Sequence, residues 1–291
     1  MNGQTGSRPP DQGPLAIICG GGSLPFAVAD AVHKRGRRAV LFALRGWADP
    51  ECVASYPHHW SALGQFGRLC ADVRAEGCRD MVFIGTLTRP PLWRLRFDFG
   101  TLRALPRILA AYRGGDNHLL SGVAAVFEQE GFRVVGAHEV APEILVPEGA
   151  LGRRRPSEAE HADIRRALAL LEATGRFDIG QAAVVAGNRV LAVEAAEGTD
   201  AMLARVAELR ARHGRGEAGG VLVKAPKPGQ DWRFDLPSVG PQTIEGAARA
   251  GLSGIAVLAG GAIIAEPQRV AALADARNIF VVGVRADGTS G

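Results

Sequence analysis

No stretch of this sequence is long and apolar enough to span a membrane, because no apolar run reaches the ~18 residues that a spanning helix needs. Residues 1–13 are polar, rich in Gly, Pro and Gln, and lack the hydrophobic segment of a secretory signal peptide. We therefore expect residues 1–13 to form a disordered leader and the protein to be cytoplasmic.

Cysteines are few and irregularly spaced. Cys19, Cys52, Cys70 and Cys78 form no CxxC pair, which argues against a disulfide framework or a zinc site and fits a reducing compartment. The sequence also lacks the HExxH motif of metalloproteases, the P-loop lysine motif and the GxSxG nucleophile elbow. We therefore expect any catalytic set to be assembled from both domains of the chain.

The positive charge is modest and dispersed. The formal net charge is +4 with a pI near 9.2, and the densest basic run is the short Arg153-Arg154-Arg155. Basic and aromatic residues are not interleaved in the way that stacks bases, so we expect no nucleic-acid partner. A mildly basic protein remains compatible with an anionic substrate.

Glycine, by contrast, is abundant, with 38 residues, roughly double its ~7% average usage. The glycines follow short apolar runs, where the backbone turns tightly or approaches a ligand. In the first half these runs lie at 15–18, 39–42, 81–84 and 132–135, with helical patterns between them. Uniformly apolar strands separated by helices are typical of a parallel sheet buried on both faces. Residues 14–140 are therefore predicted to form a Rossmann-like parallel-sheet domain.

Residues 141–156 change character, with three prolines and the arginine run, and we predict a linker there. Ser157 and Glu160 then form a capping-box pattern at the start of a helix. The turn-prone pair Gly187-Asn188 separates two apolar runs and predicts a hairpin.

The second half, over residues 157–285, is predicted to be a C-terminal catalytic α/β domain with a mixed sheet, because this hairpin accompanies further strand and helix patterns. Thr199 is placed to cap one of its helices. A cleft between two domains is a favoured ligand site, so we expect the ligand to lie between them.

The glycine loop Gly20-Gly21-Gly22-Ser23 follows the first predicted strand and precedes a helix. This geometry exposes backbone N–H groups beside a helix N-terminus and favours phosphate, so Gly21, Gly22 and Ser23 are candidate ligand contacts. A bare tight turn is the alternative interpretation. The loop is not a dinucleotide fingerprint, because Pro25 replaces the third glycine; Arg45, which could receive a 2′-phosphate, keeps an NADP enzyme open.

Gly85 and Thr86 follow the third predicted strand. Ligands bind outside the carboxyl ends of strands in open α/β sheets, so this loop should lie beside the Gly20 loop and hold an anion or a sugar. Ordinary loop chemistry would explain the same residues.

In the second domain, Gln181 opens the predicted hairpin, while Thr199 and Asp200 begin a helix whose N-terminus suits a phosphate. These three residues are candidate substrate contacts. Glu194 and Asp200 are carboxylates that could serve a cation.

The stretch from Lys224 to Gly240 combines cations and carboxylates in a loop stiffened by prolines. Stiff loops lower the entropic cost of positioning a group, which catalysis requires. Lys224 and Arg233 are placed to neutralise a diphosphate, and Lys227 is a further cation. Asp235, between two apolar residues, is placed to hold Mg²⁺ or to orient an attacking water. A structural crossover is the alternative interpretation.

Together these stretches resemble one family. Gly20 to Pro25, Gly115-Asp116, Gly136-Ala137-His138-Glu139, Asp178-Ile179-Gly180-Gln181, Glu197-Gly198-Thr199-Asp200 and Lys224 to Gly240 occur in this order. The chain resembles, over roughly residues 14–285, the UDP-2,3-diacylglucosamine pyrophosphatases of lipid A biosynthesis that are unrelated to the calcineurin-like phosphoesterases.

The resemblance implies Mg²⁺-dependent hydrolysis of UDP-2,3-diacylglucosamine to UMP and 2,3-diacylglucosamine 1-phosphate. It implies that Asp235, in the Arg-x-Asp-Leu-Pro stretch, is catalytically essential. We also expect a homodimer that contacts the cytoplasmic face of the inner membrane. Trp93, Leu95 and Phe97 are candidates for an apolar surface that receives acyl chains, and strand packing is the alternative interpretation of these residues. The alternatives are an NADP-dependent oxidoreductase and a non-catalytic module that binds a UDP-sugar lipid.

Overall fold

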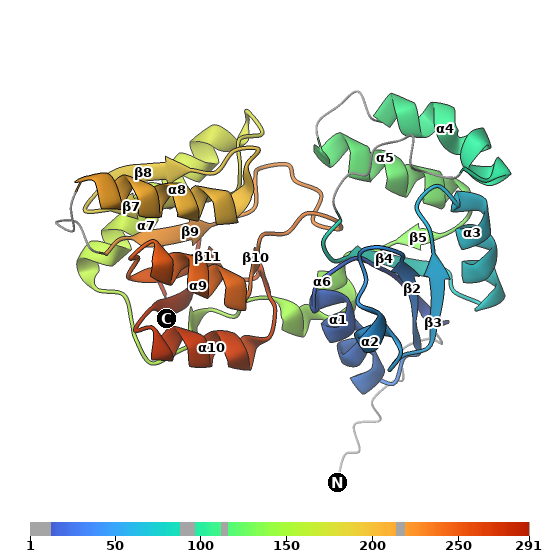
Figure 1. Cartoon of the computed structure of the whole chain (residues 1–291), viewed down its shortest axis with the longest axis horizontal. Coiled ribbons are helices and arrows are strands. Elements are labelled where there is room, and N and C mark those ends of the chain that lie inside the picture. Colours follow the sequence, from blue (N-terminus) through green and yellow to red (C-terminus); the bar gives the residue numbers. More distant parts are fainter. Residues whose placement is uncertain (1–12, 88–96, 112–115, 214–218, 291) are drawn as a thin grey trace, which may run out of the picture. The chain divides into compact units, whose positions relative to one another are not determined.

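The structure is a computed structural model that describes residues 13–87, 97–111, 116–213 and 219–290. The chain divides into two compact units, residues 1–141 (unit 1) and residues 142–291 (unit 2), which Figure 1 shows coloured along the sequence. The predicted disordered leader, apart from Gly13, lies outside the described residues.

Unit 1 contains one five-stranded sheet in which every neighbouring pair is parallel. Its order is β3-β2-β1-β4-β5, and the central strand β1 is buried along its whole length. The predicted Rossmann-like sheet is therefore confirmed. The strands are β1 (Leu15–Cys19), β2 (Ala39–Leu44), β3 (His58–Ser61), β4 (Asp80–Ile84) and β5 (Arg133–Val134).

Helices connect these strands, as the sequence pattern predicts, and α1 contacts both β1 and β2. The strand order reverses between β1 and β4, which is the topological switch point where open α/β sheets bind ligands. The loops after these two strands are the predicted Gly20 and Gly85 loops. The helices are α1 (Leu24–Lys34), α2 (Pro50–Val53), α3 (Phe66–Ala75), α4 (Phe99–Ala111), α5 (Asp116–Gln129) and α6 (Ala137–Val140).

The N-terminus of α3 is capped by residues that lie far from it in the sequence. The Asp98 carboxylate accepts the N–H groups of Gly67 (3.3 Å) and Arg68 (2.9 Å), and the Thr101 hydroxyl oxygen accepts that of Phe66 (2.9 Å). These bonds satisfy the orphan N–H groups of the first turn and hold the start of α4 against α3.

Unit 2 contains a six-stranded mixed sheet, of order β6-β13-β11-β9-β7-β8, and a small parallel pair, β10 with β12. The strands β13, β11 and β9 are parallel, whereas β6, β7 and β8 each run antiparallel to a neighbour. The predicted mixed sheet is confirmed. The strands are β6 (Gly149–Ala150), β7 (Ala182–Ala186), β8 (Arg189–Val193), β9 (Val221–Lys224), β10 (Ser238–Val239), β11 (Gly254–Leu258), β12 (Ile263–Ile264) and β13 (Phe280–Val284).

Helices cover both faces of this sheet. Alternate side chains along each strand point to opposite faces, so neighbouring residues of one strand pack in two different cores. Val221 and Val223 pack with Ile164 and Leu171 of α7 (Glu158–Gly175), whereas Leu222, between them, packs in the core formed by the other three helices. Those helices are α8 (Gly198–His213), α9 (Pro241–Arg249) and α10 (Pro267–Ala276); a 3₁₀ turn, Pro142–Ile144, precedes β6.

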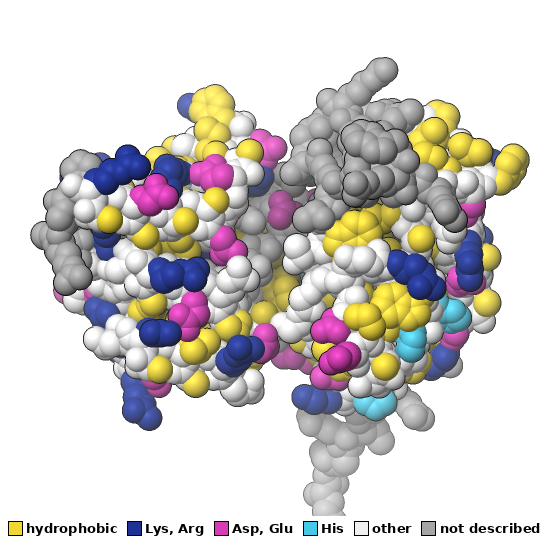
Figure 2. All heavy atoms as spheres, viewed as in Figure 1, with side chains coloured by type: hydrophobic (Ala, Val, Ile, Leu, Met, Phe, Trp, Pro, Cys, Tyr) yellow, Lys and Arg dark blue, Asp and Glu magenta, His cyan; other side chains and the backbone are white. Residues whose placement is uncertain are grey.

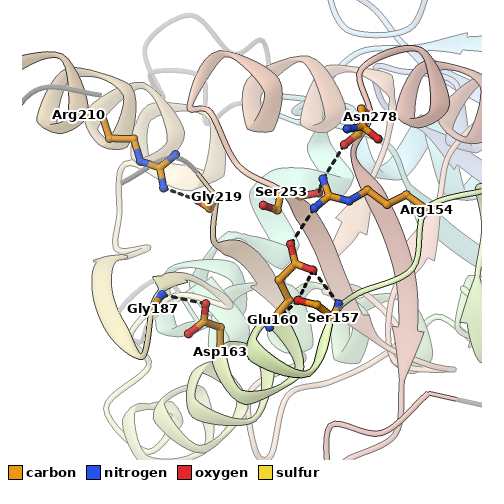
Figure 3. Close-up of polar contacts among 9 residues, drawn as sticks. All are labelled: Arg154, Ser157, Glu160, Asp163, Gly187, Arg210, Gly219, Ser253 and Asn278. Atoms are coloured by element: carbon orange, nitrogen blue, oxygen red, sulfur yellow. Dashed lines mark hydrogen bonds and ion pairs between the residues drawn. The ribbon is translucent and has the colours of Figure 1, made fainter. Parts of the chain in front are cut away.

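The predicted capping box at the start of α7 is confirmed. The Ser157 N–H donates to Glu160 Oε2 (2.8 Å), and the Glu160 N–H donates to Ser157 Oγ (3.4 Å) (Figure 3). Arg154, from the predicted basic run, donates to the carbonyl oxygens of Ser253 (2.9 Å) and Asn278 (2.7 Å) and pairs with Glu160 (2.9 Å). This arginine therefore ties three segments of unit 2 together.

The predicted hairpin is also confirmed, and a buried carboxylate holds its turn. Gly187 and Asn188 have positive φ angles of 55° and 63°, the signature of a type I′ turn. Asp163 of α7, 4% exposed, accepts the N–H group of Gly187 (3.0 Å; Figure 3). It also accepts the N–H group of Asn188 (2.6 Å).

On the face drawn in Figure 2, the Lys and Arg side chains of the described residues are scattered over both units, in keeping with the dispersed charge of the sequence. Within the described part of the chain, no helix is both long and apolar enough to cross a membrane.

Candidate functional site

In unit 2, the topology of the sheet gathers the predicted site residues at one edge. The register pairs Ala182, which opens β7, with Lys224, which closes β9, and pairs Ala183 with Val193, which closes β8. The start of β7 and the ends of β8 and β9 therefore meet at the carboxyl edge of β9. Gln181 lies there as well, since its carbonyl oxygen accepts the Ala225 N–H (3.1 Å).

Lys224 is the buried cation of this edge. It is 5% exposed, and its Nζ donates to the carbonyl oxygen of Ser238 (2.9 Å). Burial lowers the pKa of Lys224, while the charges of Glu194, Asp200 and Asp235 act in the opposite direction. Glu194, Asp200 and Asp235 therefore lie close enough to Lys224 for their charges to act on its amine.

Asp235 lies in the loop after β9, and its backbone N–H donates to the carbonyl oxygen of Asp231 (3.3 Å). Burial raises the pKa of its carboxyl, and the charges of Asp178 and Glu194 raise it further. The charge of Lys227 and a hydrogen bond from the Gln230 side chain lower the pKa only in part. Burial is thus the main reason why the pKa of Asp235 is raised, and a cation beside the carboxylate would favour its charged form.

Gln230 is a site residue that sequence reasoning missed. Its side chain is buried, with the residue 7% exposed, and its Oε1 accepts the Lys227 N–H (2.7 Å). Its Nε2 lies 3.4 Å from Gln181 Oε1, and the same side chain hydrogen-bonds to Asp235. A buried amide thus links a predicted substrate contact to the predicted catalytic carboxylate.

Glu194 is the second buried acid of this edge, 7% exposed. Its carboxylate accepts the Gln181 N–H (3.1 Å) and the Thr199 hydroxyl (2.9 Å). The prediction that Thr199 caps its helix is wrong, because α8 begins at Gly198 and the Thr199 hydroxyl donates to Glu194 instead.

The first turns of two helices meet at this edge. Asp200, in the first turn of α8, accepts a hydrogen bond from the Gln242 side chain near the start of α9 (2.9 Å). Gly240 is the N-cap residue of α9 and makes no cap through a side chain. Two helix N-termini lie close to the Lys224 ammonium in this arrangement, and both favour anions.

Arg233 is engaged within its own loop. Its guanidinium pairs with the Asp231 carboxylate through Nε (3.0 Å) and Nη2 (2.8 Å) and lies over the Phe234 ring at 5.4 Å. The role of Arg233 toward phosphate stays a prediction, and it requires the guanidinium to contact phosphate beside or in place of Asp231.

In unit 1, the two predicted loops do lie side by side. Gly21 and Thr86 form an isolated bridge with two backbone hydrogen bonds, of 2.9 and 2.8 Å. The contact is so close that a Cβ on Gly20 would lie 2.8 Å from the Thr86 oxygen, and one on Gly85 would lie 2.8 Å from the Gly20 carbonyl carbon. These glycines permit two backbones to touch.

This bridge limits how many backbone N–H groups the Gly20 loop can offer to a phosphate. The N–H groups of Gly20 and Gly21 already donate to the carbonyl oxygens of Ile84 and Thr86. Gly22 has a φ of 88°, and Ser23 is the N-cap residue of α1 without a cap bond from its side chain. Substrate binding by these residues, and by Gly85 and Thr86, stays a prediction. Arg45, on which the NADP alternative depends, lies over the Trp60 ring at 5.6 Å.

Both units match models of one protein family. The LpxI N-terminal domain model matches residues 14–144, and the LpxI C-terminal domain model matches residues 147–282. A UDP-2,3-diacylglucosamine pyrophosphatase LpxI of Caulobacter vibrioides is 46% identical over 272 residues, covering 93% of this chain and 97% of that protein. The chain belongs to the LpxI family.

Among solved structures, that of the TT0495 protein from Thermus thermophilus is 13% identical and covers 94% of this chain and 97% of its own. Its TM-score is 0.28, too low to carry an argument. The family assignment of this LpxI chain rests on the sequence matches alone.

Proposed function

We propose that this chain hydrolyses the pyrophosphate bond of UDP-2,3-diacylglucosamine, giving UMP and 2,3-diacylglucosamine 1-phosphate in lipid A biosynthesis. The observation that carries the proposal is the 46% identity, over 93% of the chain, to a protein named for this activity. The charged edge of unit 2 supports it, because phosphoryl transfer requires groups that stabilise negative charge.

In this proposal the buried Lys224 and the N-termini of α8 and α9 bind the diphosphate. The side-chain hydrogen bond between Asp200 and Gln242 holds the two helix starts together, so that both dipoles act on one site. Gln181 and Thr199, which Glu194 holds in place, contact the sugar or the nucleotide.

We further propose that the reaction depends on Mg²⁺. The described residues include no group of three or more His, Cys, Asp or Glu side chains that could hold a metal. Mg²⁺, however, is usually bound by one or two carboxylates together with substrate phosphates and water, so the single Asp235 carboxylate fits this donor set. Bound there, the ion would neutralise charge on the phosphates.

The test is to incubate the purified protein with UDP-2,3-diacylglucosamine and Mg²⁺ and to detect UMP and the lipid monophosphate by mass spectrometry. Asp235→Ala should abolish turnover while folding and substrate binding persist. Glu208→Ala is the matched control, because the Glu208 side chain is 69% exposed and forms a solvent-exposed ion pair with Arg212 of the same helix (3.6 Å). An Asp235→Ala variant that retains most of the activity would refute the assignment.

The same assay separates the alternatives. Folded wild-type protein that binds the lipid without turnover would favour the binding module, and a change in NADPH fluorescence on titration would favour the oxidoreductase. Omitting Mg²⁺, with a chelator present, tests whether the reaction depends on the metal.

We also propose that the protein contacts a membrane surface and forms a homodimer. Vesicle sedimentation would check the membrane contact, and light scattering would check the homodimer.

A further inference from the structure

Three large apolar side chains are exposed in the loops that surround the charged edge of unit 2. Phe177 is 64% exposed, Trp232 is 39% exposed and Ile179 is 38% exposed. The Arg176 guanidinium lies over the Phe177 ring at 4.8 Å, and most of that ring is nevertheless accessible. We call Phe177, Ile179 and Trp232 the apolar rim.

The chain itself places the apolar rim beside the site. Ile179 is two residues from Gln181, and Trp232 is three residues from Asp235. An extended chain spans at most ~3.6 Å per residue, so these Cα atoms lie within roughly 7 and 11 Å of those of the site residues. The turn in which the Asp235 N–H donates to Asp231 brings Trp232 closer still.

Specific contacts also fix the loop that carries Phe177 and Ile179. Asp178, between them, has a positive φ of 56° and forms an ion pair with Lys227 in the loop that follows β9. A Cβ on Gly180 would lie 2.2 Å from the Glu194 carbonyl oxygen, so the loop packs directly against the residue that binds Gln181. Strained left-handed backbone at a non-glycine residue persists where the surroundings over-determine it.

We propose that the apolar rim binds the acyl chains of the lipid-nucleotide substrate. This inference rests on the proposed function, and it assigns the part of the substrate that the charged groups do not explain. The diphosphate of such an amphiphile requires cations and helix N-termini, and its acyl chains require an apolar surface. The edge of unit 2 provides both within a few residues of each other.

The rim differs from the apolar surface that the sequence suggested for the acyl chains. Of Trp93, Leu95 and Phe97, the first two lie outside the described residues, and Phe97 is 37% exposed in unit 1. The rim residues instead adjoin Gln181 and Asp235, which in the proposed function bind the headgroup of the substrate in unit 2.

The experiment compares the wild type with Trp232→Ser and with a triple variant that also carries Phe177→Ser and Ile179→Ser. KM for UDP-2,3-diacylglucosamine is measured in mixed micelles, and the inhibition constant of UMP reports on the headgroup site. Val190→Ser is the control, because Val190 is also exposed (36%) but lies next to the hairpin turn, at the opposite end of β8 from Glu194.

We expect KM for the lipid to rise about tenfold in Trp232→Ser and on the order of a hundredfold in the triple variant, because each side chain loses apolar contact area. The inhibition constant of UMP and the thermal melting temperature should stay near the wild-type values, as should everything measured for Val190→Ser. A triple variant with an unchanged KM, or with equal losses for lipid and UMP, overturns the proposal.

The proposed function can fail separately. If the wild type folds but does not hydrolyse the lipid, the pyrophosphatase assignment fails. Equilibrium binding of the same lipid to the same variants then still tests the rim, since weaker binding by the triple variant alone supports it and equal binding refutes it.

Discussion

Asp80 opens β4 and forms the most enclosed ion pair described in unit 1. Arg133 binds its carboxylate through Nε and Nη2, both at 2.8 Å, and Arg37 binds it through Nη2 at 2.6 Å. The side chains of Asp80 and Arg37 are 9% and 15% exposed, whereas that of Arg133 is 65% exposed. The two arginines therefore differ in how much they depend on this carboxylate.

We predict that Asp80→Ala destabilises unit 1 by about 3–4 kcal/mol at pH 7. Removing one partner of a buried pair costs ~3–5 kcal/mol, and Arg37 would lose its carboxylate partner while keeping the hydrogen bond from its Nε to the Gly13 carbonyl oxygen (3.0 Å). Arg133 is hydrated in either case, and exposed pairs contribute only ~0–1 kcal/mol. Since Asp80 lies at the amino end of β4, away from the Gly85 loop, ligand binding should be preserved.

The effect should also depend on pH. Burial by itself raises the pKa of the Asp80 carboxyl, but the hydrogen bonds and charges of Arg133 and Arg37 outweigh burial and hold it below its usual value. A lowered pKa in the folded state gives stabilisation that is complete above the unfolded value of ~3.9 and is lost as the pH falls through the folded value.

Urea denaturation of the wild type and Asp80→Ala, followed by circular dichroism between pH 3 and 8, measures this difference. The difference in unfolding free energy should be constant from pH 8 to 5 and should shrink below about pH 4. A difference under 1 kcal/mol at pH 7, or one that persists unchanged to pH 3, would refute the reasoning.

Two further predictions concern buried polar groups of unit 2. Asp163→Ala should cost about 2 kcal/mol in chemical denaturation, because the N–H groups of Gly187 and Asn188 lose two hydrogen bonds to a buried carboxylate; a cost below 0.5 kcal/mol would show that the turn needs no anchor. Gln230→Glu keeps the acceptor and removes the donor toward Asp235, so we expect kcat to fall ~10–100-fold with KM nearly unchanged. Full kcat in Gln230→Glu, measured beside Gln230→Ala, would limit Gln230 to supporting its loop.

Much of the fold could be predicted because buried parallel strands appear in the sequence as apolar runs. The runs at 15–18, 39–42, 81–84 and 132–135 became β1, β2, β4 and β5. The strand β3 (His58–Ser61) was missed because it lies at the sheet edge, and its His and Trp residues interrupt the apolar pattern.

The candidate site was predictable where a charged residue lies at the end of an apolar strand, as Lys224 does. Gln230 could not be found in this way, because a glutamine in a polar loop looks solvated, and its partner Gln181 lies 49 residues away. Only the folded chain brings the two amides together. The pairing of Arg233 with Asp231 is local in sequence, but its competition with phosphate binding depends on side-chain directions that a pattern does not contain.

The backbone contact between the Gly20 and Gly85 loops bears on how relatives of this chain should be compared. Evolution would retain glycine at both positions simply because a methyl group cannot fit between the two main chains. Invariance of Gly20 and Gly85 across the family would therefore record a steric demand of unit 1. A signature of nucleotide recognition has to be sought in neighbours that have room for a side chain, such as Ser23.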